Sequence, residues 1–121
     1  MGALSETSLS ADERLLLERF ASNLRADTRN EVESIWLFGS RARGGPPSED
    51  SDVDLLVLVA DDSWDAKARI HDTLQQTARA LDLRALTWSF SVHIHTPRWL
   101  ARRREIGSFF IAEIDRDKVA A

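Results

Sequence analysis

The apolar run from Leu55 to Ala60, within the stretch "DVDLLVLVA" at residues 52–60, constrains the fold more than any other feature. A strand with one wet face alternates apolar and polar residues, whereas a strand covered on both sides has a continuous apolar run. We therefore expect a strand that is buried on both faces inside a layered domain. Asp52 and Asp54 stand at its start, where burial alone gives no reason for charge.

The remaining segments alternate between helical and strand patterns. Ser10 followed by Glu13 predicts a capping box at the start of the first helix. The predicted elements after that helix are a strand at 32–38, a glycine- and proline-rich loop at 44–50, the strand at 52–60, a helix capped within 61–63, a strand at 88–95, a helix beginning near Pro97, and a last helix at 107–117. This order predicts an α/β (α+β) fold, with a small mixed β-sheet and helices packed mainly on one face. We expect a flexible N-terminal tail at 1–9 and a single domain at 10–121.

Asp52 and Asp54 are candidate metal ligands. Residues two apart on a strand point to the same face, with Cα atoms roughly 6.5 Å apart, while Val53 faces the core. Two carboxylates this close repel each other unless a cation lies between them, and oxygen ligands of this kind prefer a hard ion such as Mg²⁺.

Gly39 and Ser40 end the strand at 32–38 and are candidate nucleotide-binding residues. Glycine lets a ligand approach the backbone closely, and free N–H groups at such a turn bind phosphate oxygens. Arg41 and Arg43 follow in the sequence and add cationic donors. Together with the acid pair, this pattern predicts a site for a nucleoside triphosphate with its metal ion.

Composition narrows the class of protein. The chain has 121 residues, a formal net charge of −4, no cysteine and no tyrosine. Because the net charge is negative, we expect no direct binding to nucleic acid. The absence of cysteine excludes disulfides and thiolate metal sites, and no apolar run is long enough to cross a membrane. The N-terminus lacks the pattern of a signal peptide, so we expect a cytoplasmic protein.

The stretch "LFGSRARGGPPSEDSDVDLLV", residues 37–57, resembles the signature of the nucleotidyltransferase superfamily related to DNA polymerase beta, and most closely that of the minimal nucleotidyltransferases. The superfamily signature is Gly-Ser, a short spacer and Asp-x-Asp; here residues 41–51 form a spacer one residue longer than usual. The resemblance implies a palm-like nucleotidyltransferase fold. It also implies that Asp52 and Asp54 hold one or two Mg²⁺ ions and that Gly39, Ser40 and Arg43 bind the triphosphate of ATP.

The same resemblance implies an activity and a partner. An acceptor hydroxyl would attack the α-phosphorus of ATP, so that AMP is transferred and pyrophosphate leaves. Some minimal members are antitoxins that pair with a HEPN-domain toxin and modify one of its tyrosines. Because this chain has no tyrosine and no room for a separate substrate-binding domain, we expect the acceptor to lie on a partner, with a homo-oligomer as a further option.

The sequence departs from the superfamily pattern at one place. A third acid is expected on the strand at 88–95, near Ser91, yet residues 87–104 contain neither Asp nor Glu. His93 and His95 share the face of Ser91 by alternation, but imidazole suits Zn²⁺ or Mn²⁺ better than Mg²⁺. We interpret them as half-exposed strand residues.

Three functions follow from these observations. The first is an Mg-dependent nucleotidyltransferase acting as an antitoxin. The second is a catalytically degenerate binding module that neutralises its partner by contact, which the missing acid favours. The third is a small-molecule nucleotidyltransferase of the antibiotic-modifying kind. Outside the motif, the arginine-rich run at 98–104 is expected to be a solvated helix face, and Trp64 and Trp99 are candidates for an exposed interface.

Overall fold

One mixed sheet organises the molecule. The computed structural model describes residues 7–44 and 52–121. In spatial order the strands are β3 (Phe90–His95), β2 (Val53–Val59), β1 (Val32–Phe38) and β4 (Val119–Ala120). β1 pairs antiparallel with both β2 and β4, whereas β2 and β3 run parallel. The sheet is therefore mixed, as the sequence predicts.

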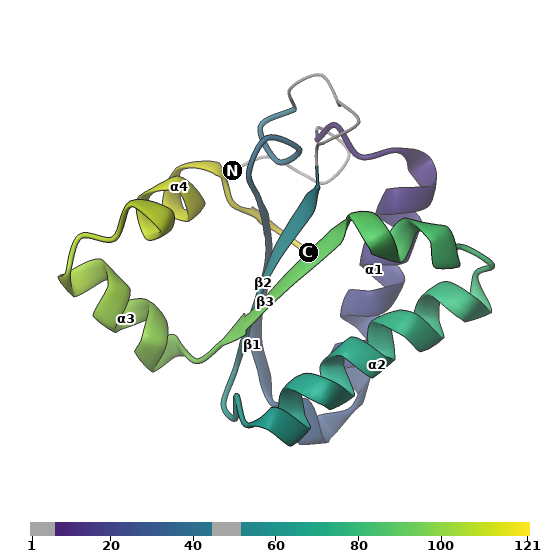
Figure 1. Ribbon diagram of the computed structural model, residues 1–121, viewed down its shortest axis with the longest axis horizontal. Coiled ribbons are helices and arrows are strands. Elements are labelled where there is room, and N and C mark those ends of the chain that lie inside the picture. The colour runs from purple at the N-terminus through teal and green to yellow at the C-terminus, as the bar shows by residue number, and fades with distance from the viewer. Residues whose placement is uncertain (1–6, 45–51) are drawn as a thin grey trace.

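Helices cover both faces of this sheet (Figure 1). The longer helices α1 (Ala11–Ala26) and α2 (Trp64–Ala80) pack on one face, and the shorter helices α3 (Pro97–Glu105) and α4 (Phe109–Asp117) lie against the other. The expected α/β class is confirmed, and the two longer helices do share one face. The two shorter helices on the opposite face are a difference from the expectation, and they arise because β2 offers a second apolar surface.

The alternation of side chains along β2 explains the two cores. Val53 and Leu55 join the larger core, which lies under α1 and α2. Leu56 and Leu58 join the smaller core, which α3 and α4 complete. Since successive side chains of a strand point to opposite faces, Asp54 lies on the same face as Leu56, beneath α3 and α4. Burial of β2 on both faces is thus confirmed.

Local capping starts the helices where the sequence predicts. The backbone N–H of Glu13 donates to Ser10 Oγ at 3.1 Å, and the Ser10 N–H donates to Glu13 Oε1 at 2.8 Å, which completes a capping box. Ser63 caps α2 by accepting from the Ala66 N–H. Thr96 caps α3, with a proline in its first turn. Each cap satisfies backbone donors that the first helical turn leaves without partners.

Two elements differ from the sequence expectation. The third strand begins at Phe90, and Trp88 instead lies in the 3₁₀ segment Arg84–Ser89, where it is 91% exposed. Ser89 Oγ donates to the Leu86 carbonyl at 2.9 Å, so the local turn competes with an earlier start of the strand. The strand β4 has only two residues and carried no recognisable pattern.

The two segments expected to be irregular fall largely outside the described residues. These are the tail at 1–9, described only from residue 7, and the loop at 44–50, described only at Gly44. Ser8 is tied to the turn that follows β1, because its N–H donates to the Arg41 carbonyl at 3.0 Å. Within 7–44 and 52–121, no helix combines the length and the apolar character that a bilayer crossing requires.

Candidate functional site

Gly39 and Asp54 meet at the end of the sheet where β1 stops and β2 begins. Phe38, the last residue of β1, pairs in register with Asp54, and Gly39 follows directly with φ +80°. A Cβ atom placed on Gly39 would lie 2.8 Å from Asp54 Oδ2, which is closer than such atoms approach in proteins. Two features therefore favour glycine at this position. One is the positive φ, and the other is the Asp54 carboxylate, which leaves no space for a Cβ atom.

A tight turn follows Gly39 and presents Ser40. The N–H groups of Ala42 and Arg43 donate to the Gly39 carbonyl at 3.1 and 3.3 Å, and the Gly44 N–H donates to the Arg41 carbonyl at 3.3 Å. Ser40 is exposed at the head of this turn. The predicted association of the Gly-Ser turn with the second acid of the Asp-x-Asp pair is thus present in the structure.

The side chain of Arg41 points inward. Arg41 is only 5% exposed; it forms a buried ion pair with Glu13 and donates from Nη2 to the Ser8 carbonyl at 2.9 Å. We expected Arg41 to be a phosphate donor, but its guanidinium anchors the turn to the start of α1. The sequence indicated Glu13 only as a capping residue, and no local pattern links it to Arg41.

Arg43 anchors the other side of the turn. Its Nη1 atom donates to Asp117 Oδ2 at 2.6 Å, and the side chain of Asp117 is 2% exposed whereas that of Arg43 is 47% exposed. Hydrogen bonds from Arg116, and then from Arg43, hold the pKa of Asp117 below its usual range although burial opposes this. Half of Arg43 thus faces solvent and remains available to an anion. Asp117 lies 74 residues further along the chain, so sequence reasoning missed it.

Asp54 and Asp52 form an electrostatically unfavourable pair. Asp54 is half-buried in β2, and Asp52 precedes the strand and is exposed. Burial raises the pKa of Asp54, the neighbouring Asp52 raises it further, and the His93 ring acts in the opposite direction. A bound cation removes such a penalty, because it stabilises the ionised form of both carboxylates.

Ser91 occupies the position beside Asp54 on the adjacent strand. The parallel strands β2 and β3 pair these two residues in register. Ser91 Oγ lies 3.4 Å from His93 Nε2, and the His93 ring packs against Phe38 and Phe110, with ring centroids 5.7 and 5.6 Å away. Across the described segments, no group of three acidic, histidine or cysteine side chains converges.

The donor set at this point suits a hard cation, with two carboxylates as the strong ligands. Asp54 and Asp52 supply charged oxygens, and Ser91 could add only a neutral hydroxyl. Two acids meet the requirement for Mg²⁺ when substrate phosphates and water complete the coordination shell. The chemistry of these residues therefore fits a magnesium ion whose remaining ligands are phosphate oxygens and water.

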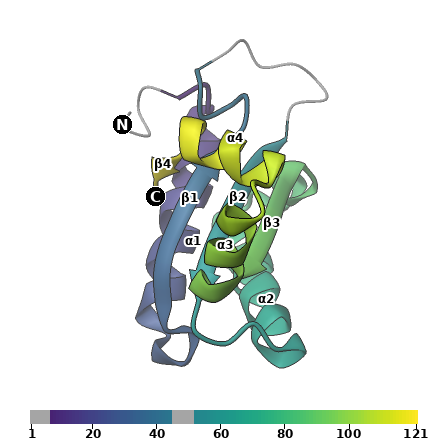
Figure 2. The same cartoon turned by 90° about the vertical axis from the view of Figure 1, so that its left-hand side faces the viewer.

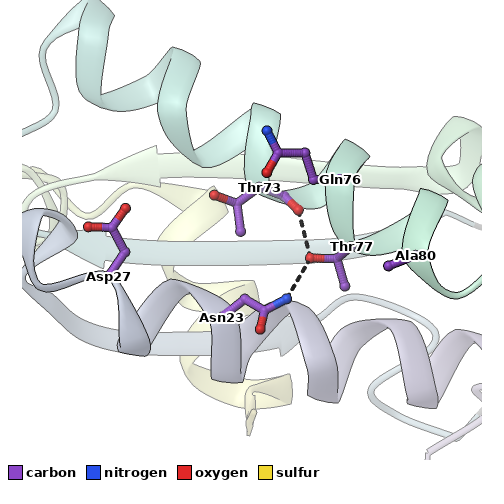
Figure 3. Close-up of a pocket in the computed structure, with 6 residues that line it drawn as sticks. All are labelled: Asn23, Asp27, Thr73, Gln76, Thr77 and Ala80. Carbon is purple, nitrogen blue, oxygen red and sulfur yellow. Dashed lines mark hydrogen bonds between the residues drawn. The ribbon is translucent and has the colours of Figure 1, made fainter.

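A hollow of about 280 Å³ lies elsewhere, between α1 and α2 (Figure 3). Asn23 Nδ2 donates to Thr77 Oγ1 at 2.9 Å inside it, and Thr77 Oγ1 donates to the Thr73 carbonyl at 2.7 Å. This hollow lies between the helices that cover the larger core, on the face of the sheet away from α3 and α4 (Figure 2). Asp54 is on the other face, because it alternates with its neighbours along β2 and shares the face of Leu56. The hollow therefore takes no part in the candidate site.

Residues 23–96, more than half of the chain, match the family described as Polymerase beta, Nucleotidyltransferase. The chain belongs to this family. The matched segment contains the Gly39 turn, both aspartates and Ser91. In this nucleotidyltransferase, Arg43 lies within the matched segment but its partner Asp117 lies outside it.

One solved structure has a similar fold. It is described as "Crystal structure of the toxin-antitoxin with AMP-PNP" and is 23% identical in sequence, with a TM-score of 0.51. The alignment covers 85% of this chain and 70% of that one. A search of curated proteins found no significant match.

Proposed function

We propose that this nucleotidyltransferase transfers a nucleoside monophosphate, AMP from ATP, to a hydroxyl group of a partner protein. The observation that carries the proposal is the contact between Gly39 and Asp54. It joins a backbone turn suited to phosphate oxygens with a carboxylate suited to the metal of the same nucleotide. Family membership supports the reaction class.

Each residue has a defined role in this proposal. The turn at Gly39 and Ser40 binds the β- and γ-phosphates through backbone N–H groups, and the exposed half of Arg43 neutralises their charge. Asp52 and Asp54 would hold Mg²⁺, which supplies Lewis-acid activation of the acceptor and stabilises the leaving group. The acceptor hydroxyl loses its proton to solvent and its oxygen forms a bond to the α-phosphorus. The bond from the α-phosphorus to the oxygen that bridges to the β-phosphate breaks, and pyrophosphate departs with that oxygen.

The proposed partner is a HEPN-domain toxin, for which this chain would be the antitoxin. The structural neighbour is described as a toxin–antitoxin crystallised with AMP-PNP, an ATP analogue, and this supports the pairing. Since the chain contains no tyrosine, a tyrosine acceptor has to belong to the partner.

A second candidate is a binding module that neutralises its partner by contact alone. Ser91 favours this reading, because a neutral hydroxyl stands beside Asp54 where the resemblance implies a third acid. A serine hydroxyl is neither a strong Mg²⁺ ligand nor a base that removes the proton of the acceptor.

One experiment separates the two candidates. The protein is incubated with α-labelled ATP, with Mg²⁺ or Mn²⁺, and with the protein encoded by the neighbouring gene. Transfer of label that is lost in Asp52→Asn and Asp54→Asn, but kept in the exposed control Asp72→Asn, supports the enzyme. Tight association without transfer supports the binding module. If neither transfer nor association is observed, both proposals are wrong.

A further inference from the structure

Trp64 is the first residue of α2, and its side chain is not packed in either hydrophobic core. Its side chain is 84% exposed, and Asp62 and Asp65 beside it are exposed as well. The turn is well ordered: the Ser63 N–H donates to Asp61 Oδ1 at 2.9 Å, and Ser63 Oγ caps the helix. A large aromatic ring held in water on a fixed, acidic turn is typical of an interface residue.

A hollow of about 350 Å³ with the opposite charge lies on α3. It is lined by Trp99, Arg102, Arg103 and Ile106, and Ile106 is 71% exposed. Of the arginines of α3, Arg104 pairs with Asp115, whereas the other three form no ion pair with the described part of the chain. The chain as a whole has a net charge of −4, so this hollow is a local basic and apolar patch on an acidic molecule.

The Trp64 turn and helix α3 lie near the same end of the sheet, although α2 and α3 pack on opposite faces. β2 and β3 are parallel neighbours; α2 follows the end of β2, and α3 follows the end of β3. Both helices therefore begin at the end of the sheet where β2 and β3 finish, and the hollow continues along α3 from there (Figure 1). Burial lowers the pKa of His95 at the end of β3, and Asp62 before α2 and Arg103 on α3 both act on it electrostatically, so His95 lies between the two surfaces in charge as well as in sequence position.

We propose that this end of the molecule binds a second copy of the chain. Trp64 of each copy inserts into the α3 hollow of the other, and the acids around it face Arg102 and Arg103. One chain carries both complementary surfaces near the same end of its sheet. A two-fold axis therefore places each Trp64 turn against the α3 hollow of the other copy, and the assembly closes at two copies. This dimer is independent of the proposed nucleotide transfer.

The arrangement of aromatic rings in the hollow favours binding of a protein side chain over binding of a nucleic-acid base. A base would need a free ring face for stacking. The Trp99 ring is stacked on His95 with ring centroids 3.6 Å apart and 5° between their planes, and the Arg103 guanidinium lies over it at 5.4 Å. The hollow therefore offers an inserted side chain apolar contacts with Trp99 and Ile106, next to cationic arginines.

Charge reversal tests this arrangement with the protein alone. Light scattering after size exclusion should show a dimer for the unchanged chain at concentrations between about 10 μM and about 1 mM, which detects micromolar association. Arg102→Glu and Asp65→Arg should each elute as monomers. An equimolar mixture of the two variants should recover the dimer, because in a two-fold pair both contacts then join opposite charges. The double variant should also dimerise.

Matched controls guard against misfolding and general charge effects. Arg79→Glu and Trp88→Ala alter an exposed arginine and an exposed tryptophan elsewhere, and both should stay dimeric, while Trp64→Ala should be monomeric. Circular dichroism checks that each variant is folded. A monomer at every concentration overturns the proposal. So do a dimer that survives Trp64→Ala, a mixture that stays monomeric, and a series of larger species, which indicates an open head-to-tail contact.

Discussion

Ser91 lies beside Asp54 because the parallel strands β2 and β3 hold these two residues in register. The backbone thus brings residue 91, near which the resemblance implies a third acid, next to one of the two aspartates. Nothing in the backbone prevents a carboxylate there. The missing ligand is therefore a matter of one side chain.

Ser91→Asp should create a stronger metal site. We expect Mn²⁺ to bind about tenfold more tightly or better, on the scale by which changes around metal ligands alter affinity. Without metal, the added charge should lower the melting temperature, because it faces Asp54. Calorimetric Mn²⁺ titration and thermal denaturation measure both effects. Ser91→Asn is the uncharged control and should show neither; a variant that binds Mn²⁺ no better than the parent would contradict the proposed metal site.

Gly39→Ala should destabilise the protein through two separable effects. The positive φ costs about 1 kcal/mol or more for a residue with a side chain, and the new Cβ also collides with Asp54 Oδ2. Gly107→Ala is a matched control, since Gly107 has φ +65° and no atom lies within 4 Å of the place that an added Cβ would occupy. Urea denaturation should show the larger loss at Gly39, and Asp54→Ala should reduce that loss to the value at Gly107. Equal losses at the two glycines in the unchanged background would rule out the collision.

Glu13→Gln should cost about 3 kcal/mol of unfolding free energy, because it removes the charge of one partner from a buried ion pair. The exposed pair of Arg104 and Asp115 supplies the comparison, and Asp115→Asn should cost under about 1 kcal/mol. Chemical denaturation of both variants measures the difference. Similar costs would mean that burial adds nothing to the ion pair at the turn.

Stability should also fall in acid through Glu13. Burial raises the pKa of Glu13, but hydrogen bonds from Ser10 and Arg41 outweigh it and leave the pKa lowered. A lowered folded-state pKa means that the stabilisation is complete above the unfolded value, near 4.5, and is lost as the pH falls through the folded one. Denaturation at a series of pH values from neutral to acid should therefore show a shallower decline in Glu13→Gln than in the parent. Parallel curves would exclude Glu13 as a contributor.

Arg43→Met should weaken ATP binding by about 10- to 100-fold, which corresponds to the loss of a charged hydrogen-bonding partner worth about 1.5–3 kcal/mol. Arg116→Met is the matched control, because Arg116 also pairs with Asp117 but lies on α4 outside the turn. Titration with a fluorescent ATP analogue measures both without requiring transfer. If Arg116→Met weakened binding as much, the effect would belong to Asp117 and not to contact with the triphosphate.

Local patterns predicted most of the fold. The capping box at Ser10, the continuous run of β2 and the proline start of α3 depend on neighbouring residues, so the sequence displays them directly. The 3₁₀ segment around Trp88 and the two-residue strand β4 were missed, since a side-chain turn and a distant pairing decide them.

The candidate site also contains some residues that the sequence predicts and others that it does not. Gly39, Asp52 and Asp54 were found because one short segment contains them all. The partners of the two arginines were not, because Glu13 and Asp117 come from remote helices and tertiary packing alone brings them to the turn. The sequence therefore displays the candidate ligand-binding residues more readily than the residues that hold the turn in place.

The two arginine anchors have a practical consequence for handling this protein. One ties the turn to the first helix and the other ties it to the last, so both extremities of the described chain support the same few backbone atoms. Ala121 is itself fixed, since its carbonyl accepts from Arg25 at 2.7 Å and its N–H donates to the Ile35 carbonyl at 2.9 Å. Removal of the segment that carries Asp117 will therefore release the Gly39 turn and, through Val119, also open the larger core.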